Sequence, residues 1–258
     1  MSYTVVIPAR YGASRLPGKP LRLIAGRTLV EHAWRLARES GAERVIVATD
    51  DERVATVARE FGAEVCITGT QHASGTDRIA EVARVVGLAD DHIVVNLQCD
   101  EPQMPAALLD QVARAIAEDA EVSIATLCAP IREAAELFDP NVVKVVVNAR
   151  GHALYFSRAP IPWARDAFAR APGVMPEGDA AYLRHIGLYA YRAGFLQEFV
   201  GWTPCMLERT EALEQLRALW HGRVIRVEVA HVRPGPGIDT EEDLTALRVA
   251  VEGSGPAG

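Results

Sequence analysis

The sequence has no apolar run that approaches the roughly 20 residues a membrane-spanning helix needs, so we expect no membrane partner. Its first residues carry no basic segment ahead of an apolar stretch, which a secretory signal would require. The formal net charge is -7, and nucleic-acid-binding proteins usually present a basic face, so no nucleic-acid partner is expected either. These absences predict a soluble cytoplasmic globular protein.

Cysteine is also scarce, and the four cysteines lie far apart, at Cys66, Cys99, Cys128 and Cys205. No two of them have the CxxC spacing that zinc sites and redox dithiols use. Three of them stand in apolar runs. We therefore expect reduced thiols in a core, and neither disulfides nor a zinc site.

Apolar segments, in contrast, are abundant: 49% of the 258 residues are hydrophobic, enough for a large core. In the first half, strand-like runs alternate with stretches of helical period, which favours a mainly parallel sheet flanked by helices. Later the pattern changes to a hairpin that turns at Asn148–Gly151, and residues 207–222 read as one helix. We predict one α/β domain over 1–258, with an inserted antiparallel element at about 140–200 and a disordered tail at 253–258.

One stretch after the first strand combines three cations with restricted backbone: "RYGASRLPGKPL", residues 10–21. In open parallel sheets, ligands bind beyond the carboxyl ends of the strands, where this loop must lie. Arg10, Arg15 and Lys19, together with Ser14 and backbone donors, suit a triphosphate bound in an extended wrap. The alternative interpretation is a basic surface turn.

The loop is not a P-loop, whose pattern is GxxxxGK[ST]. Gly12 and Gly18 are separated by five residues, and Pro20 stands where the magnesium-binding hydroxyl would be. Pro20 also resists the helix that a P-loop must open into. The sequence also lacks the GxGxxG fingerprint of dinucleotide-binding folds at this position.

Carboxylates follow two other predicted strands. Asp100 and Glu101 come directly after the most apolar strand, in "NLQCDEP", and Asp239 stands in "GPGIDT". Mg²⁺ prefers one or two carboxylates together with phosphate oxygens and water, so a magnesium site is one interpretation. The alternatives are that Asp100 begins a turn before Pro102 and that Asp239 belongs to a helix cap.

Several segments, in order along residues 3–250, resemble the 3-deoxy-manno-octulosonate (Kdo) cytidylyltransferase family, also called CMP-Kdo synthetases. They are "IPARYGASRLPGKPL", "HASGTDRIAEV", "NLQCDEP", "ALYFSRAPIPW", "RHIGLYAYR", "LEQLRALW" and "PGIDTEEDL". The resemblance implies a Rossmann-like fold of the nucleotide-diphospho-sugar transferase type and a homodimer whose contact includes the 140–200 insertion. It also implies transfer of CMP from CTP to Kdo, with release of pyrophosphate, for lipopolysaccharide biosynthesis.

The resemblance further implies a role for each matching residue. Magnesium would be held by Asp100 and Asp239, which would act in catalysis with Arg15 and Lys19. The triphosphate and cytosine would be bound by Arg10, Ser14, Arg15, Lys19, Ser74, Gly75, Thr76, Arg78 and Gln98. The sugar would be bound by Arg158, Arg165, His185, Tyr189, Glu214 and Gln215, each of which could instead be an ordinary surface or core residue.

Cys99 departs from the family pattern, which usually has glycine at this position. We expect its side chain to crowd the nucleotide or to force an unfavourable backbone angle beside Asp100. Two alternatives therefore accompany the Kdo assignment. One is the same chemistry on a related acid sugar, such as 8-amino-Kdo or a sialic-acid-like sugar, and the other is a non-catalytic nucleotide-binding paralogue.

Overall fold

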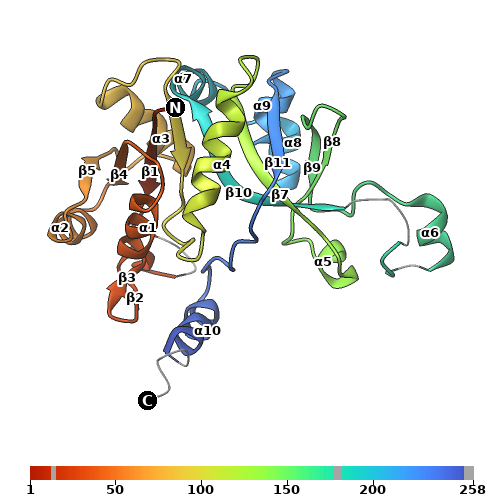
Figure 1. The fold of residues 1–258 in the computed structure, drawn as a ribbon, viewed down its shortest axis with the longest axis horizontal. Helices are drawn as coiled ribbons and strands as arrows, with labels where there is room; N and C mark the ends of the chain where they lie inside the picture. The colour runs from red at the N-terminus through yellow and green to blue at the C-terminus, as the bar shows by residue number, and fades with distance from the viewer. Residues whose placement is uncertain (13–15, 172, 177–181, 253–258) are drawn as a thin grey trace.

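The computed structural model describes residues 1–12, 16–171, 173–176 and 182–252. Its centre is a twisted sheet in the strand order β11-β7-β10-β6-β1-β4-β5, with helices on both faces (Figure 1). The strands of this path are β1 Tyr3–Pro8, β4 Arg44–Thr49, β5 Glu64–Ile67, β6 Ile93–Asn96, β7 Ile124–Pro130, β10 Leu183–Arg192 and β11 Ile225–Val229. Among the described residues, no helix has both the length and the apolar character to cross a membrane.

The two faces of the sheet carry separate cores. The helices whose apolar residues join the core on one face are α1 Leu29–Arg38, α2 Glu52–Glu60 and α4 Ala106–Ala117. Those on the other face are α3 Gly75–Val85, α7 Ala193–Val200 and α9 Leu216–Trp220. This two-faced burial explains why β1 and β6 read as continuous apolar runs, because a strand covered on both faces has no solvent side to alternate with.

The remaining elements lie around this framework. They are η1 Lys19–Leu21, β2 Leu23–Ile24, β3 Arg27–Thr28, α5 Ala134–Phe138, β8 Lys144–Val147, β9 Ala153–Ser157, α6 Arg165–Arg170, α8 Met206–Glu211 and α10 Glu241–Glu252. The hairpin predicted at 148–151 is present, because β8 and β9 pair antiparallel. The α6 segment, in a stretch expected to be a loop, extends away from the sheet beyond this hairpin (Figure 1).

The prediction of a mainly parallel sheet is confirmed, since β1 pairs parallel with β4 and β6, and β11 with β7. One strand breaks the pattern: β10 runs antiparallel between β6 and β7. The last part of the 140–200 segment is thus central to the sheet. In its earlier part, β8 pairs with the start of β10 and β9 pairs with β8, and only the stretch from β9 to α6 projects from the sheet (Figure 1).

The single helix expected over 207–222 is wrong. The structure has two short helices, α8 and α9, separated by Ala212 in a left-handed conformation with φ of 51°. α9 buries Leu216 and Ala218 whereas α8 has no buried residue, so the two segments do not share one buried helical face. The predicted tail at 253–258 lies outside the described residues.

Candidate active site

Three loops far apart in the sequence meet at one point beside the sheet. Lys19, in η1 after β1, places its Nζ 2.5 Å from Oδ2 of Asp100, which follows β6. The same Nζ lies 3.1 Å from Oδ1 of Asp239, which precedes α10. The backbone adds a link, because the N–H of Ile238 donates to the carbonyl of Asp100 at 2.9 Å. We call Lys19, Asp100 and Asp239 the carboxylate centre.

The local backbone explains how Lys19 reaches this position. Gly18 has φ of 66°, the left-handed region that glycine tolerates best, and a Cβ there would approach the Tyr11 ring to 3.3 Å. The N–H of Gly18 donates to the carbonyl of Tyr11, and that of Lys19 to the carbonyl of Leu16, both at 3.1 Å. Pro20 follows in the first turn of the short helix, where its missing N–H is not needed. The described residues of the loop thus have the turn geometry that glycine and proline favour, and its stiffness stays a prediction.

The carboxylate centre favours positive charge. Burial lowers the pKa of Lys19, but the hydrogen bonds and charges of Asp100 and Asp239 outweigh it, so the pKa lies above its ordinary value. Nearby, burial and the same two carboxylates raise the pKa of Glu101 to about 7. An additional negative charge is therefore unfavourable at the carboxylate centre, whereas a bound cation is favourable.

These two carboxylates fit magnesium. Both aim an oxygen at one small cation, the Lys19 ammonium, although they come from segments 139 residues apart by number (239 less 100). Within the part of the chain that the structure describes, no three His, Cys, Asp or Glu side chains gather into a metal cluster. A metal with only two protein ligands would need water and phosphate oxygens, which is the way Mg²⁺ is bound with nucleotides.

A cavity of about 110 Å³ brings together six of the fifteen predicted nucleotide and sugar residues. Its lining includes Gly75, Thr76, Asn96, Gln98, Gly187, Tyr189, Tyr191, Glu214 and Gln215. The Oγ1 of Thr76 donates to Oε2 of Glu214 at 2.6 Å, which joins the start of α3 to the α8–α9 turn. Gly75 allows Gln98 close approach, since a Cβ at this glycine would lie 3.3 Å from the Gln98 amide nitrogen. We call this space the nucleoside cavity.

Two residues predicted to read cytosine have structural contacts of their own. The Ser74 hydroxyl accepts from the backbone N–H of Asp77 and caps α3, with Asp77 returning the hydrogen bond. Arg78 is only 2% exposed, lies 3.1 Å from the Asp50 carboxylate and donates to the Thr68 hydroxyl. Arg78 does not line the nucleoside cavity, so its contact with the base stays a prediction.

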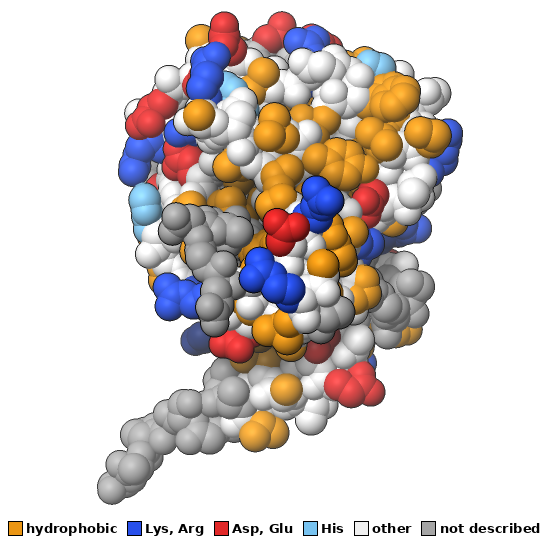
Figure 2. Space-filling view, turned by 90° about the vertical axis from the view of Figure 1, so that its right-hand side faces the viewer, with side chains coloured by type: hydrophobic (Ala, Val, Ile, Leu, Met, Phe, Trp, Pro, Cys, Tyr) orange, Lys and Arg blue, Asp and Glu red, His pale blue; other side chains and the backbone are white. Residues whose placement is uncertain are grey.

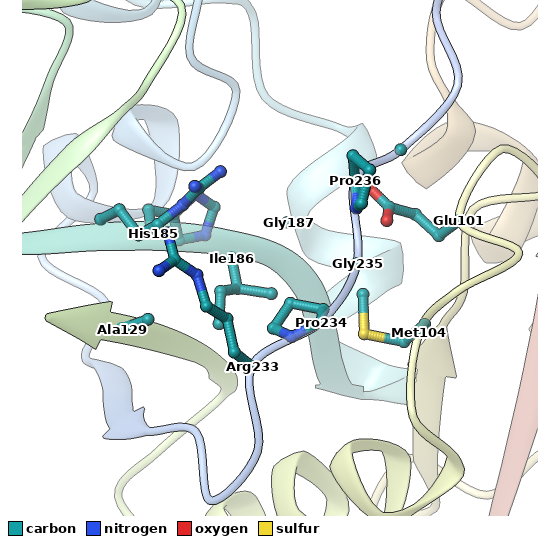
Figure 3. Close-up of a pocket in the computed structure, with 12 residues that line it drawn as sticks. Glu101, Met104, Ala129, His185, Ile186, Gly187, Arg233, Pro234, Gly235 and Pro236 are labelled. Carbon is teal, nitrogen blue, oxygen red and sulfur yellow. The ribbon is translucent and has the colours of Figure 1, made fainter. Parts of the chain in front are cut away.

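A second cavity, of about 330 Å³, lies beside the first, and Gly187 lines both. His185 and Arg233 stand at one side of it and Glu101 and Met104 at the other, with the chain at 234–236 passing between them (Figure 3). We call it the outer cavity. Two of its cations are residues that sequence reasoning missed, Arg184 and Arg233, although Arg184 stands in the "RHIGLYAYR" motif.

Those two arginines share one acid. Nη1 of Arg184 lies 2.7 Å from Oε1 of Glu136 in α5, and Nη2 of Arg233 lies 3.3 Å from the same oxygen. The other acid in the lining of the outer cavity is Glu101, whose pKa is raised to about 7, so protonation of Glu101 would leave the two guanidinium groups in excess of Glu136 for an acidic ligand. Nothing in the local sequence pairs these positions, because Glu136 and Arg233 are brought together only by the fold.

His185 is held as a neutral ring. Its Nε2 lies 2.9 Å from the Thr126 hydroxyl, and the ring meets Phe156 edge-on at 5.1 Å. Burial, with a smaller effect of the Arg184 charge, lowers the pKa of His185 to about 3. It can therefore serve the site as a hydrogen-bonding group at neutral pH and carries no charge there.

The other predicted sugar residues differ in where they lie. Arg158 donates from Nε to the Glu211 carbonyl at 2.7 Å and from Nη1 to the Pro140 carbonyl at 3.0 Å, so it borders the α8–α9 turn. Arg165 is exposed at the first residue of α6 and lines neither cavity. Arg10 is exposed on its loop. Ser14 and Arg15 lie outside the described residues.

Cys99 fits the structure without strain. Its side chain is 7% exposed and packs in the same core as Leu97 and Met104. The non-glycine residues with positive φ in the described chain are Ala25 and Ala212, so the expected unfavourable backbone angle at Cys99 is wrong. Burial also raises the pKa of the thiol, which is therefore neutral and a poor metal ligand.

Comparison with known proteins agrees with this geometry. The family model described as cytidylyltransferase matches residues 4–226. A protein of Pseudomonas fluorescens named 3-deoxy-manno-octulosonate cytidylyltransferase is 57% identical over 97% of this chain and 98% of its own length. A protein of the same name from Marinobacter nauticus is 55% identical over 100% of both chains.

Solved structures give the same picture. A CMP:2-keto-3-deoxy-manno-octonic acid synthetase complexed with CTP has a TM-score of 0.88 and 42% identity, covering 98% of this chain and 99% of its own. A cytidylyltransferase from Leptospira borgpetersenii has a TM-score of 0.61 at 14% identity, over 97% of this chain and 86% of its own, and supports the fold alone.

Proposed function

This chain belongs to the cytidylyltransferase family, among the 3-deoxy-manno-octulosonate cytidylyltransferases, and on that premise we propose that it transfers CMP from CTP to the anomeric hydroxyl of Kdo. The products are CMP-Kdo, used in lipopolysaccharide biosynthesis, and pyrophosphate. The observation that carries the proposal is the meeting of Lys19, Asp100 and Asp239, whose near neighbours in sequence, Glu101 and Gly237, line the outer cavity. A cation and two carboxylates brought together from three loops are suited to handling a charged ligand.

The reaction needs no protein nucleophile. The anomeric oxygen of Kdo forms a bond to the α-phosphorus of CTP, the bond from that phosphorus to the β-phosphate oxygen breaks, and the hydroxyl proton leaves to solvent. Pyrophosphate carries away the negative charge. Catalysis of such an in-line transfer consists mainly of positioning and charge neutralisation.

Asp100 and Asp239 are the residues we propose for holding Mg²⁺. When bound, this ion supplies charge neutralisation at phosphate oxygens and lowers the pKa of a coordinated hydroxyl. This division of labour is consistent with the neutral His185, whose pKa of about 3 makes it a poor general base at neutral pH. The two carboxylates converge on one cation already, which supports the assignment.

Lys19 supplies a fixed positive charge from the chain itself. Its pKa lies above the ordinary value, so it stays protonated at neutral pH. Its loop is stiffened by Gly18 and Pro20, and a held cation stabilises developing charge without reorganising first. We propose that Lys19, with Arg10 and Arg15 of the same loop, neutralises the triphosphate and the departing pyrophosphate.

An acid sugar needs both a cation and hydroxyl-reading groups. The cavities offer Tyr189, Glu214 and Gln215 as hydroxyl readers, and His185 as an uncharged one. Arg158 borders them through the α8–α9 turn. This combination supports Kdo or a closely related acid sugar as the acceptor.

We also propose a homodimer in the cytoplasm. Large apolar side chains are exposed on and near the projecting element, among them Leu154 at 60%, Trp163 at 62% and Met206 at 58%. The face of the molecule on that side has hydrophobic side chains gathered at its centre, with a few charged ones among them (Figure 2). Monomeric soluble proteins rarely expose a large contiguous apolar patch, so a second copy of the chain is a suitable cover.

The proposal is tested by pyrophosphate release from CTP with Mg²⁺ and Kdo. We expect turnover with Kdo that exceeds turnover with 8-amino-Kdo and with a sialic acid, and none when CTP is replaced by ATP. Preference for another acid sugar would keep the chemistry and change the acceptor. Tight CTP binding without turnover on any sugar of the panel would instead indicate a non-catalytic nucleotide-binding protein.

A further inference from the structure

A second buried lysine lies away from the carboxylate centre, at the base of the β8–β9 hairpin. Lys144 begins β8 and is 0% exposed. Its ammonium donates to three backbone carbonyl oxygens: those of Asp139 at 2.9 Å, Val142 at 2.5 Å and Arg158 at 2.6 Å. We call this arrangement the carbonyl cage. The three N–H donors of a lysine are matched by three acceptors, so the ammonium is fully hydrogen-bonded.

The carbonyl cage surrounds a buried positive charge with backbone oxygens. Burial lowers the pKa of Lys144, and the more distant Asp139 and Glu211 charges offset this only in part. Loop carbonyls at 139 and 142 have no regular ladder to satisfy them, and buried polar groups without partners are costly. The cage therefore holds the 139–142 loop against the end of β9 more tightly than an apolar side chain could.

The end of β9 is where the cage reaches the proposed sugar site. The carbonyl of Arg158 accepts from Lys144, while the Arg158 side chain donates to Pro140 and Glu211 carbonyls, which closes a ring of contacts. Glu211 in turn accepts from the Ser157 hydroxyl at 2.6 Å and from the Arg158 N–H at 3.0 Å. Three short segments are thereby locked together.

The ring ends at the turn that presents the cavity residues. Glu211 is the last residue of α8, and Ala212 follows with its left-handed φ of 51°. Glu214 and Gln215, just beyond, line the nucleoside cavity. Because Glu214 and Gln215 lie three and four residues beyond Glu211, we expect a shift of the Arg158–Glu211 contact to move them.

We propose that Lys144 is a positioning residue for the acid-sugar side of the active site. It touches no substrate; it fixes Arg158 and, through Glu211, the turn that carries Glu214 and Gln215. This inference rests on the proposed function, because it assumes that the acceptor binds among these residues. It predicts a defect in sugar binding that exceeds any defect in CTP binding, to which the turn is linked by the hydrogen bond from Thr76 to Glu214.

The test is Lys144→Met, which keeps the length of the side chain and removes the ammonium. Steady-state kinetics should show KM for Kdo raised about tenfold, with KM for CTP and the calorimetric Kd for CTP within about twofold of wild type. A lost structural contact elsewhere would not separate the two substrates in this way.

Arg192 provides a matched control. It also donates to backbone carbonyls, those of Val122 at 3.0 Å, Ile116 at 3.1 Å and Asp119 at 3.3 Å. It is, however, the last residue of β10, whereas β8 with Lys144 pairs with the start of that strand. We expect Arg192→Met to lower the melting temperature as Lys144→Met does and to leave both KM values unchanged. A rise in KM for Kdo in the Arg192 variant as well would overturn the positioning role.

Should Lys144→Met not fold, Ser157→Ala decides the question. It removes one hydrogen bond to Glu211 from the same ring, so KM for Kdo should rise about two- to threefold with CTP affinity unchanged. Unchanged Kdo kinetics in every folded variant would overturn the inference while leaving the proposed function intact. Absence of Kdo turnover in the wild type would instead remove the proposed function itself.

Discussion

Two buried lysines in this molecule are stabilised in opposite ways. Lys19 is 8% exposed and faces two carboxylates, and its pKa lies above the ordinary value. Lys144 is 0% exposed and faces three backbone carbonyls, and its pKa lies below the ordinary value. The first region surrounds its cation with full negative charges on side chains, the second with dipoles that belong to the folded backbone.

This difference distinguishes a site suited to binding a ligand from a site that maintains the conformation of the backbone. Carboxylates on side chains can exchange one cation for another, which is compatible with our proposal that Asp100 and Asp239 pair with Lys19 in the free protein and hold a metal in the complex. Backbone carbonyls cannot leave their places without unfolding the loops that carry them. The carboxylate centre is therefore suited to binding and releasing a ligand, whereas the carbonyl cage is suited to holding its loops in one conformation.

The strongest way to break the carboxylate centre is to remove a charge from it. Asp100→Asn keeps the size of the side chain and should lower kcat/KM by about 10³, because one of the two proposed magnesium ligands is lost. Pyrophosphate release measures this effect. Asp119→Asn is the control, since Asp119 caps a turn far from the centre and should keep nearly full activity. Equal activity in Asp100→Asn and wild type would reject the centre as catalytic.

Loss of the carbonyl cage should lower the stability of the protein. Lys144→Met removes a donor from three carbonyls, of which that of Asp139 still accepts from the Val142 N–H, and we expect the free energy of unfolding to fall by about 3 kcal/mol. Urea denaturation followed by circular dichroism measures this. A loss below about 0.5 kcal/mol would show that water or a rearranged loop replaces the ammonium easily, and that the cage is not rigid.

The Lys19→Met variant tests the carboxylate centre by removing its cation. We expect kcat to fall about 50-fold because a charge that neutralises the triphosphate is lost, while stability changes by less than about 1 kcal/mol, since Asp239 is largely exposed. Steady-state kinetics and denaturation on the same samples separate the two effects. Arg22→Met, which removes an exposed cation paired with Glu241 near the same loop, should leave kcat unchanged.

His185, in β10 beside the outer cavity, gives a pH test. Its folded pKa of about 3 is depressed below the usual value of about 6.5, so the unfolded state binds a proton that the folded state does not between these pH values. Stability should therefore be lost as pH falls below 6.5, by up to about 1.4 kcal/mol per pH unit from this residue. His185→Gln should flatten the curve of unfolding free energy against pH. Parallel curves for variant and wild type would contradict the buried neutral ring.

Cys99→Gly should have the smallest effect. The thiol is packed and its backbone unstrained, so glycine should cost about 1 kcal/mol of stability through lost packing and added chain entropy. Activity should stay within about threefold of wild type, as measured by pyrophosphate release. A gain of tenfold or more would show that the sulfur crowds the bound nucleotide.

Much of the fold could be read from periodicity. The alternation of apolar runs and helical stretches predicted the parallel part of the sheet, and the hairpin at 148–151 followed from its turn residues. The antiparallel insertion of β10 could not be foreseen, because a strand covered on both faces has the same apolar pattern in either direction. The break between α8 and α9 also escaped, since Ala212 carries no local signal of a left-handed residue.

The site was predictable where the chain itself supplies the signal. Cations among glycine and proline marked the Lys19 loop, and acids after apolar strands marked Asp100. The family resemblance then marked Glu214 and Gln215, which do line the nucleoside cavity. Arg184 and Arg233 were missed because their meaning depends on sharing Glu136, a contact between residues about 50 and 100 positions away.

The sequence by itself determined which segments become strands and helices and which residue types follow the strands, because hydrophobic period and turn chemistry act over a few residues. Only the tertiary structure decided that Lys19 lies between Asp100 and Asp239, and that Lys144 finds three carbonyl oxygens. A lysine has no local preference for either partner set. The free-energy cost of burying its charge is offset only when chain segments far apart in sequence bring their charges and dipoles to one point. Such a meeting of segments is a property of the whole fold.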